Sequence, residues 1–304
     1  MVKDKDGFIV EVASPTGFCF GVKRAVESLE KCIEERASVG EKVYSIGMPI
    51  HNPQEVERLC QKGLVVTDKI EDVPEGASVF IRAHGAPPKV KKLLAERCGG
   101  RVIDATCPFV KNAQEKAALL SGEGYALLVL GDPGHPEVQA IVGCASGEVF
   151  VASSLSEVRE LVKKDKLGVI SQTTQKTELF AEAVGILAGS ARELRVFNTI
   201  CGATTQRQDG VRRMTGTVDG IIVVGGRNSA NTAKLAEIAS AGGCDVKWIE
   251  HAGELDKEWF NGKIKIGIAA GASTPDWLID ELKNALETSQ MSRGMEGYDG
   301  RNDE

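Results

Sequence analysis

The sequence predicts an α/β protein with mainly parallel sheets, because short runs rich in β-branched residues alternate along the chain with amphipathic helical stretches. The helical stretches that show the apolar spacing of a surface helix are 25–35, 90–98, 232–242 and 275–287. The runs expected to form strands are 8–13, 42–47, 78–83, 101–105, 125–131, 148–152, 167–172, 194–199, 219–226, 244–249 and 264–271.

Three of the expected strands end in a short polar turn that carries a cysteine and leads into a helix, at Cys19, Cys107 and Cys201. These cysteines are 88 and 94 residues apart, which suggests three similar α/β domains arranged with pseudo-threefold symmetry. The first two of these domains would cover 20–106 and 107–199. Residues 291–304 have little to bury, so we expect a disordered tail.

Composition limits the partners and the location of the protein. The formal net charge is -6 and the basic residues are scattered, so nucleic acid is not an expected partner. No apolar run approaches the roughly 18 residues of a membrane span, and the first residues lack the apolar core of a signal peptide. Eight cysteines without paired short spacings are typical of reduced thiols. We therefore expect a cytoplasmic protein with no membrane partner.

Polar residues gather where the expected strands end, which is where ligands bind to open parallel sheets. Each of these turns leads into a helix, whose N-terminus can bind an anion, although simple helix capping would need the same residue types. The sequence has neither a phosphate-binding GxxxxGK[ST] loop nor a regular dinucleotide fingerprint. The turns together predict a shared anion site that uses His51, His84, His135, Glu137, Thr173, Thr174, Thr204, Thr205, Asn228, Ser229, Asn231 and Ser273, with Arg82 and Arg227 nearby.

The cysteines fall into two groups. Cys19, Cys107 and Cys201 stand at helix N-termini, which favour the thiolate that a metal ligand must be. If the three domains pack around one axis, the three thiolates meet, and they could hold either an iron-sulfur cluster with one open iron or a three-thiolate zinc. The other cysteines are expected to be small apolar core residues: Cys32, Cys60, Cys98, Cys144 and Cys244.

The turns, taken in order, resemble the 4-hydroxy-3-methylbut-2-enyl diphosphate reductase family over almost the whole chain. The motifs that carry the resemblance are GFCFGV, IHNP, AHG, DATCP, GHPEV, QTT, CGATT, NSAN and GASTPD. The resemblance implies three α/β domains around a central cluster, with the N-terminal strand completing the third domain, which would comprise 1–19 together with 200–290. It also implies one [4Fe-4S] cluster with three cysteine ligands, Cys19, Cys107 and Cys201, and an open fourth iron.

The resemblance further implies a reductive dehydroxylation that yields isopentenyl and dimethylallyl diphosphates, the last step of the methylerythritol phosphate pathway. Its catalytic residues would be Glu137, Thr173 and His135, and an external donor such as ferredoxin or flavodoxin would supply electrons to a monomeric enzyme. The family often has serine where this chain has Ala230, so one hydroxyl contact to the diphosphate is absent or replaced by backbone. The residues that would bind the allylic diphosphate are His51, His84, His135, Thr173, Thr204, Ser229, Ala230, Asn231 and Ser273.

Two other classes of protein share some of these features. A zinc hydrolase acting on a phosphorylated substrate could use Glu137 as its base. A redox sensor or scaffold would need the cysteines but not the turns with histidine, threonine and glutamate. Colour separates a cluster from zinc, and tight binding of an allylic diphosphate argues against a sensor.

Overall fold

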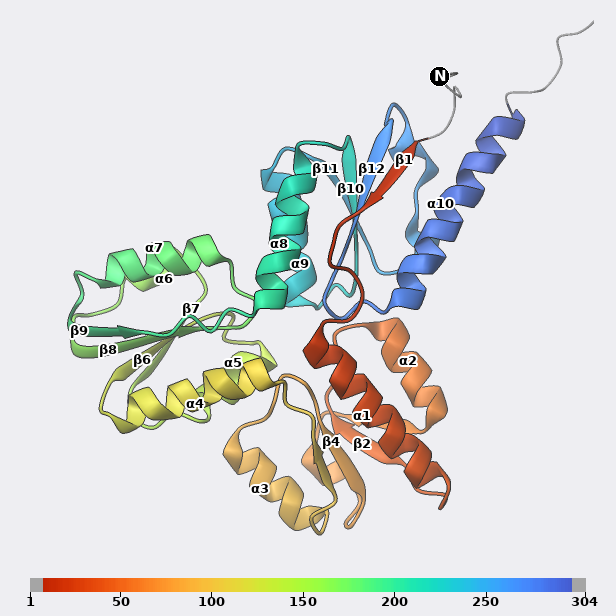
Figure 1. Cartoon of the computed structure of the whole chain (residues 1–304). Helices are drawn as coiled ribbons and strands as arrows, with labels where there is room; N and C mark the ends of the chain where they lie inside the picture. The colour runs from red at the N-terminus through yellow and green to blue at the C-terminus, as the bar shows by residue number, and fades with distance from the viewer. Residues whose placement is uncertain (1–7, 297–304) are drawn as a thin grey trace, which may run out of the picture. The chain divides into compact units, whose positions relative to one another are not determined.

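The computed structural model describes residues 8–296, with side chains as far as residue 288. Within this range the strands form three four-stranded sheets, and every strand pairing is parallel (Figure 1). None of the helices in this part of the chain has the length and apolar character that a membrane span requires. The sheets and the helices between them confirm the α/β class.

The chain forms two compact units. The central unit is Phe20–Thr205, and the terminal unit comprises the described residues before and after it. The sequence predicts separate domains over 20–106 and 107–199, whereas the structure joins them in the central unit. Contacts tie the two halves together: the Cys107 N–H donates to the Ala83 carbonyl at 2.9 Å, and Pro87 lies against Gly143.

The first half of the central unit is built on sheet B. Residues on one face of this sheet pack on α1 and α2, and those on the other face pack on α3. The parallel strands bury both faces, as expected for an α/β unit. The elements are α1 (Phe20–Ala37), β2 (Val43–Ile46), α2 (Pro53–Lys62), β3 (Leu64–Thr67), η1 (Ile70–Asp72), β4 (Ser78–Ile81), α3 (Pro88–Arg97) and β5 (Val102–Asp104).

The second half is built on sheet C, whose central strands β6 and β8 are buried over residues 127–130 and 167–171. Alternate residues face α4 and α5 on one side and α6 and α7 on the other (Figure 1). The elements are α4 (Pro108–Gly122), β6 (Ala126–Leu130), α5 (Pro136–Val142), β7 (Val149–Ala152), α6 (Leu155–Arg159), β8 (Lys164–Ser171), α7 (Thr177–Leu187) and β9 (Ala191–Val196).

The terminal unit is built on sheet A. Here β1 pairs with β12, so the N-terminal strand completes the sheet of the C-terminal part as expected. One face packs on α10 and the other on α8 and α9. The elements are β1 (Ile9–Val12), α8 (Gly202–Thr215), β10 (Gly220–Val224), α9 (Ala230–Ala241), β11 (Asp245–Ile249), η2 (Ala252–Glu254), η3 (Lys257–Phe260), β12 (Lys265–Ala270) and α10 (Asp276–Glu296).

The three sheets share one strand order, which supports the repeat suggested by the cysteine spacing. Sheet B has the order β3-β2-β4-β5, sheet C has β7-β6-β8-β9, and sheet A has β11-β10-β12-β1. In sheet A the strand β1 therefore takes the place that β5 and β9 hold in the others. Each sheet reverses its winding between its first and third strands, and such a switch point opens a crevice for ligands.

Two predictions need correction. The strand β3 was not expected, because its four residues follow α2 after a single glycine, Gly63, and give too short an alternation to stand out. The tail was expected to begin at 291, but α10 continues to Glu296. Met291, Arg293 and Glu296 have good helix propensity, so they extend a helix that is already formed. Residues 297–304 of the expected tail lie outside the described range.

Candidate functional site

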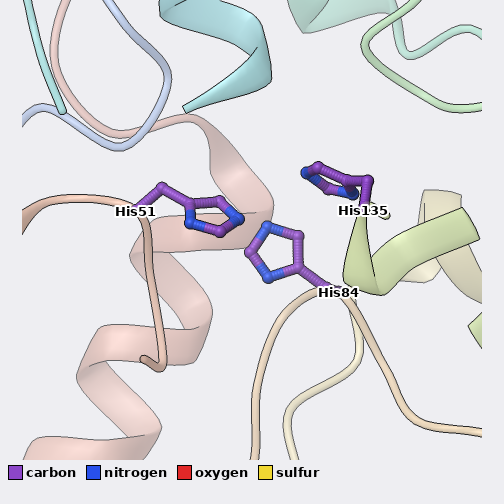
Figure 2. Close-up of side chains that lie close together, drawn as sticks. All are labelled: His51, His84 and His135. Carbon is purple, nitrogen blue, oxygen red and sulfur yellow. The ribbon is translucent and has the colours of Figure 1, made fainter. Parts of the chain in front are cut away.

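Three histidines of the central unit meet at the switch points of sheets B and C. His51 follows β2, His84 follows β4, and His135 caps the N-terminus of α5 after β6. The ring centroids of His51 and His84 are 4.5 Å apart, and His135 lies 5.4 Å and 5.3 Å from them. Figure 2 shows the three rings turned toward one another. Residues 84 positions apart in the sequence thus line one small space, as expected for a shared anion site.

Burial keeps these imidazoles neutral. It lowers the pKa of His51 to about 4, with help from the nearby His135 and Arg82 charges. Burial also lowers the pKa of His135 to about 4 and that of His84 well below its usual value. Without a ligand, the three rings therefore present neutral groups near pH 7.

Proximity alone would allow a metal ion, since the nearest ring nitrogens of the three histidines all lie within 4.8 Å of one another. The hydrogen bonding of His135 argues against it. Its Nδ1 accepts the N–H of Glu137 at 3.2 Å, so in the neutral ring the proton is on Nε2. A metal-bound histidine normally does the opposite and donates a proton from its second nitrogen. The arrangement instead suits donation of N–H hydrogen bonds to an anion.

Glu137 is the buried acid of the site. Its side chain is 2 % exposed, and its two carboxyl oxygens lie 2.6 Å from the Thr173 N and 2.8 Å from the Thr173 Oγ1. Burial raises the pKa of Glu137 to about 7, although the two hydrogen bonds with Thr173 oppose the shift. A carboxyl group with such a pKa can give up a proton at neutral pH, as a general acid must.

Thr173 and Cys201 lie in consecutive turns of sheet C. Thr173 follows β8, and its carbonyl accepts the N–H of Cys201 at 2.9 Å. The Cys201 carbonyl in turn accepts the N–H of Thr204, which is 4 % exposed, at 2.9 Å. Two residues before Thr173 and two before Cys201, the Thr199 Oγ1 donates to the Ser171 carbonyl at 2.6 Å. The backbone therefore fixes the Cys201 turn relative to the residue that holds Glu137.

Sequence analysis did not single out Gln172, which connects two loops of the site. This side chain is 4 % exposed; its Oε1 accepts the N–H of Asp132 at 3.1 Å, and its Nε2 donates to Thr174 at 2.9 Å. It ties the loop that carries His135 to the loop that carries Thr173. The only signal in the sequence is a run of polar residues that follows an apolar strand.

The Cys107 turn is held by charged and polar neighbours. Asp104 accepts the Thr106 N–H at 3.0 Å and pairs with Lys91 at 2.9 Å, while Arg24 of α1 donates to the Thr106 carbonyl at 3.2 Å. The start of α1 lies against the thiol: a Cβ placed on Gly21 would be 2.4 Å from the Cys107 Sγ. Only glycine leaves this sulfur its space.

Cys19, Cys107 and Cys201 hold equivalent places in the three sheets. Each follows the edge strand at the same position in its sheet, which is β1, β5 or β9. Each is also the residue directly before a helix, which is α1, α4 or α8. The first turn of each of these helices contains no acidic residue. All three cysteines are half-buried. The equivalence supports a common role for the three thiols.

Four of the five remaining cysteines match the expected packing role. Cys32 and Cys98 are buried in apolar clusters, and Cys60 and Cys244 pack against the edges of such clusters. Burial raises the pKa of each of these thiols and of Cys144, which favours the protonated, unreactive form.

The terminal unit has its own group of polar residues at the switch point between β10 and β12. Ser229 caps α9 through the Thr232 N–H at 3.3 Å, and Ala230 is the first residue of this helix. Asn231 is 5 % exposed, and its amide nitrogen and oxygen have no hydrogen-bond partner among the described residues. Ser273 follows β12 and is 7 % exposed. A buried amide without a partner is costly, so the surroundings of Asn231 suit a polar ligand.

Parallel sheets with polar switch points, a buried acid and clustered N–H donors define an α/β enzyme that acts on an anionic substrate. A family model described as LytB protein matches residues 10–287, and the chain belongs to this family.

Named relatives agree with the family. A 4-hydroxy-3-methylbut-2-enyl diphosphate reductase of Citrifermentans bemidjiense is 44% identical over 273 residues, which cover 90% of this chain and 95% of the relative. The Aquifex aeolicus enzyme of the same name is 43% identical over 279 residues, covering 91% of this chain and 95% of the relative.

Solved structures are also similar. One is of (E)-4-hydroxy-3-methyl-but-2-enyl diphosphate reductase, described as the terminal enzyme of the non-mevalonate pathway. It is 42% identical and covers 92% of this chain and 99% of its own, with a TM-score of 0.67. The other, E-1-hydroxy-2-methyl-but-2-enyl-4-diphosphate reductase from Plasmodium falciparum, is 26% identical and covers 91% of this chain and 87% of its own, with a TM-score of 0.86.

Proposed function

We propose that this chain reduces (E)-4-hydroxy-3-methylbut-2-enyl diphosphate to isopentenyl and dimethylallyl diphosphates, the last step of the methylerythritol phosphate pathway. Two electrons and two protons remove the allylic hydroxyl as water. The observation that carries the proposal is the buried Glu137, held by Thr173 beside three clustered histidines. Relatives that match nine-tenths of the chain bear the name of this reductase.

The three equivalent cysteines fit an iron-sulfur cluster. Thiolates are the usual ligands of such clusters, helix N-termini favour the thiolate form, and Gly21 leaves the Cys107 sulfur accessible. Cys19, Cys107 and Cys201 would hold one [4Fe-4S] cluster and leave the fourth iron without a protein ligand. When bound, the cluster would supply electrons and an open iron that polarises the substrate hydroxyl. The sequence contains no flavin or nicotinamide motif, so an external donor such as ferredoxin or flavodoxin would supply those electrons.

Glu137 supplies the two protons in turn: one converts the leaving hydroxyl to water, and the other adds to a carbon of the reduced allyl group. Its raised pKa of about 7 keeps a large fraction of the carboxyl protonated at neutral pH. The Thr173 hydroxyl, 2.8 Å from the carboxyl, orients the acid and passes the proton along. His135 positions Glu137 by accepting its backbone N–H.

The polar turns at the strand ends would bind the diphosphate, as the resemblance implies. His51, His84 and His135 would donate N–H groups, together with Thr204. The other residues of this set are Ser229, Asn231 and Ser273, with the backbone at Ala230 in place of a hydroxyl. Binding energy from the diphosphate, which does not react, then holds the allylic carbon in position.

An anaerobic assay tests this function. Protein with its cluster rebuilt, a low-potential electron donor and the hydroxymethylbutenyl diphosphate should give both isomeric products. A brown protein that contains iron and sulfide supports the cluster, whereas a colourless zinc protein that releases phosphate would support a hydrolase. A cytoplasmic location and a monomeric state stay predictions; size-exclusion chromatography with light scattering checks the latter.

A further inference from the structure

Arg82 lies at the switch point of sheet B beside the histidines. Arg82 directly follows the last residue of β4. In the pairing of β2 with β4, Ser45 is opposite Phe80. If this register continues for two more residues, Gly47 is opposite Arg82. A Cβ built on Gly47 would lie 2.9 Å from the Arg82 Nη1 and 3.3 Å from its Cζ. The guanidinium therefore rests against the Gly47 backbone, in the loop that leads to His51.

The charge of Arg82 is not balanced by the protein. The side chain is half-buried, and it forms no ion pair or hydrogen bond within residues 8–288. Burial lowers its pKa, and the exposed Asp68 opposes that shift without forming an ion pair. Withdrawing an arginine from water without a partner is unfavourable, so its retention here needs another explanation.

The electrostatic effect of Arg82 reaches all three imidazoles. Its positive charge is one of the causes that lower the pKa of His51, His84 and His135, after burial in each case. Asp132 acts on His135 in the opposite direction. Because the imidazoles are neutral, Arg82 is the fixed positive charge beside the space that they line.

We propose that Arg82 is a specificity-determining residue that binds the diphosphate group of the substrate together with His51, His84 and His135. The proposal rests on the proposed function for the identity of the substrate. A guanidinium binds two phosphate oxygens at once through its planar fork, and Gly47 leaves one edge of this fork uncovered by a side chain. Arg82 supplies a positive charge and the neutral imidazoles supply N–H donors, so the four groups favour an anion jointly.

Two variants separate the charge from the packing. Arg82→Met keeps the aliphatic stem against Gly47 and removes the charge, whereas Arg82→Lys keeps the charge and removes the fork. Calorimetry of the cluster-containing protein with inorganic diphosphate, without turnover, measures the effect. We expect the dissociation constant to rise about tenfold in Arg82→Met, equivalent to about 1.4 kcal/mol, and about threefold in Arg82→Lys. The control is Lys92→Met on α3, whose side chain is 79% exposed and should not alter binding.

Steady-state kinetics provide a second readout. The KM for the substrate should rise with the dissociation constant in Arg82→Met, while kcat changes by less than threefold. The binding of diphosphate should also become less sensitive to salt. Should Arg82→Met fail to fold, Arg82→Gln replaces it as the neutral variant.

Unchanged diphosphate binding in the neutral variant, or a loss of kcat at constant KM, would overturn the role of Arg82. These results are distinct from failure of the proposed function. If the wild-type protein does not turn over the substrate but its diphosphate binding depends on Arg82, the anion site stands and the reaction is wrong. If the wild type is active and Arg82→Met binds diphosphate normally, only the inference about Arg82 fails.

Discussion

Replacement of Glu137 by glutamine tests the proton-donor assignment with little change of shape. In the folded protein the Thr173 N–H points at one carboxyl oxygen and the Thr173 hydroxyl contacts the other. A glutamine can accept the N–H with its oxygen and donate its amide hydrogen to the hydroxyl, as the protonated acid does. Glu137→Gln therefore keeps the contacts of the protonated form and removes its acidic proton.

The size of the effect follows from the position of the carboxyl. Loss of a positioned general acid lowers turnover about 10²–10⁴-fold. Stability should respond differently, because burial raises the pKa of Glu137 from 4.5 to about 7. The stability that this raised pKa contributes is fully present below pH 4.5 and is lost as pH rises through about 7, a change of roughly 3 kcal/mol. The glutamine variant lacks this fall, so at pH 8 it should be at least as stable as the wild type.

The assay compares both proteins with rebuilt clusters under anaerobic conditions. The iron and sulfide contents of the two proteins should match. Denaturant unfolding of the cluster-free proteins from pH 5 to pH 8 should show that the free energy of unfolding falls with pH more steeply in the wild type than in the variant. Turnover should differ by at least 100-fold. Turnover within threefold of the wild type would remove Glu137 from the reaction. An equal slope of stability with pH would show that the carboxyl is not held in its protonated form.

Other outcomes follow from the cysteine turns and the histidines. Cys107→Ser should lose most of the iron and sulfide that the wild type binds, and full retention would refute the ligand assignment. Gly21→Ala places a methyl group 2.4 Å from the Cys107 sulfur, so the iron content should fall by more than half. In the control Gly122→Ala the new methyl group meets no atom within 4 Å, and iron should be unchanged. The lowered pKa values of His51 and His135, both about 4, contribute stability that is present above pH 6.5 and lost as pH falls through about 4. Unfolding of the cluster-free protein should be more acid-sensitive over this range than that of His51→Gln, and parallel curves would contradict the lowered pKa values.

Most of the fold could be predicted from the sequence, because strands buried on both faces appear as short apolar runs between amphipathic helices. Within residues 8–296, eleven expected strands correspond to strands of the structure, and only β3 was missed. The joining of 20–106 and 107–199 in one unit could not be predicted. It depends on contacts such as that of Cys107 with Ala83, which local sequence patterns do not reveal.

For the candidate site, the sequence supplied the residues and the structure supplied their environment. His51, His84, His135, Glu137 and Thr173 could be named from turns at strand ends, because the carboxyl edge of a parallel sheet collects such turns. Arg82 could be placed near them, but the direction of its side chain could not be inferred. Gln172 was overlooked because its role is to join two loops that are distant in sequence.

The sequence by itself therefore determined the α/β class, the family motifs and the identity of the polar turns, all of which depend on local composition and spacing. Only the tertiary structure decided which turns share a crevice, since the strand order brings the ends of the first and third strands of each sheet together. It also decided the protonation of the site. Desolvation depends on atoms packed from distant parts of the chain, and this packing raises the pKa of Glu137 and lowers the pKa values of the histidines.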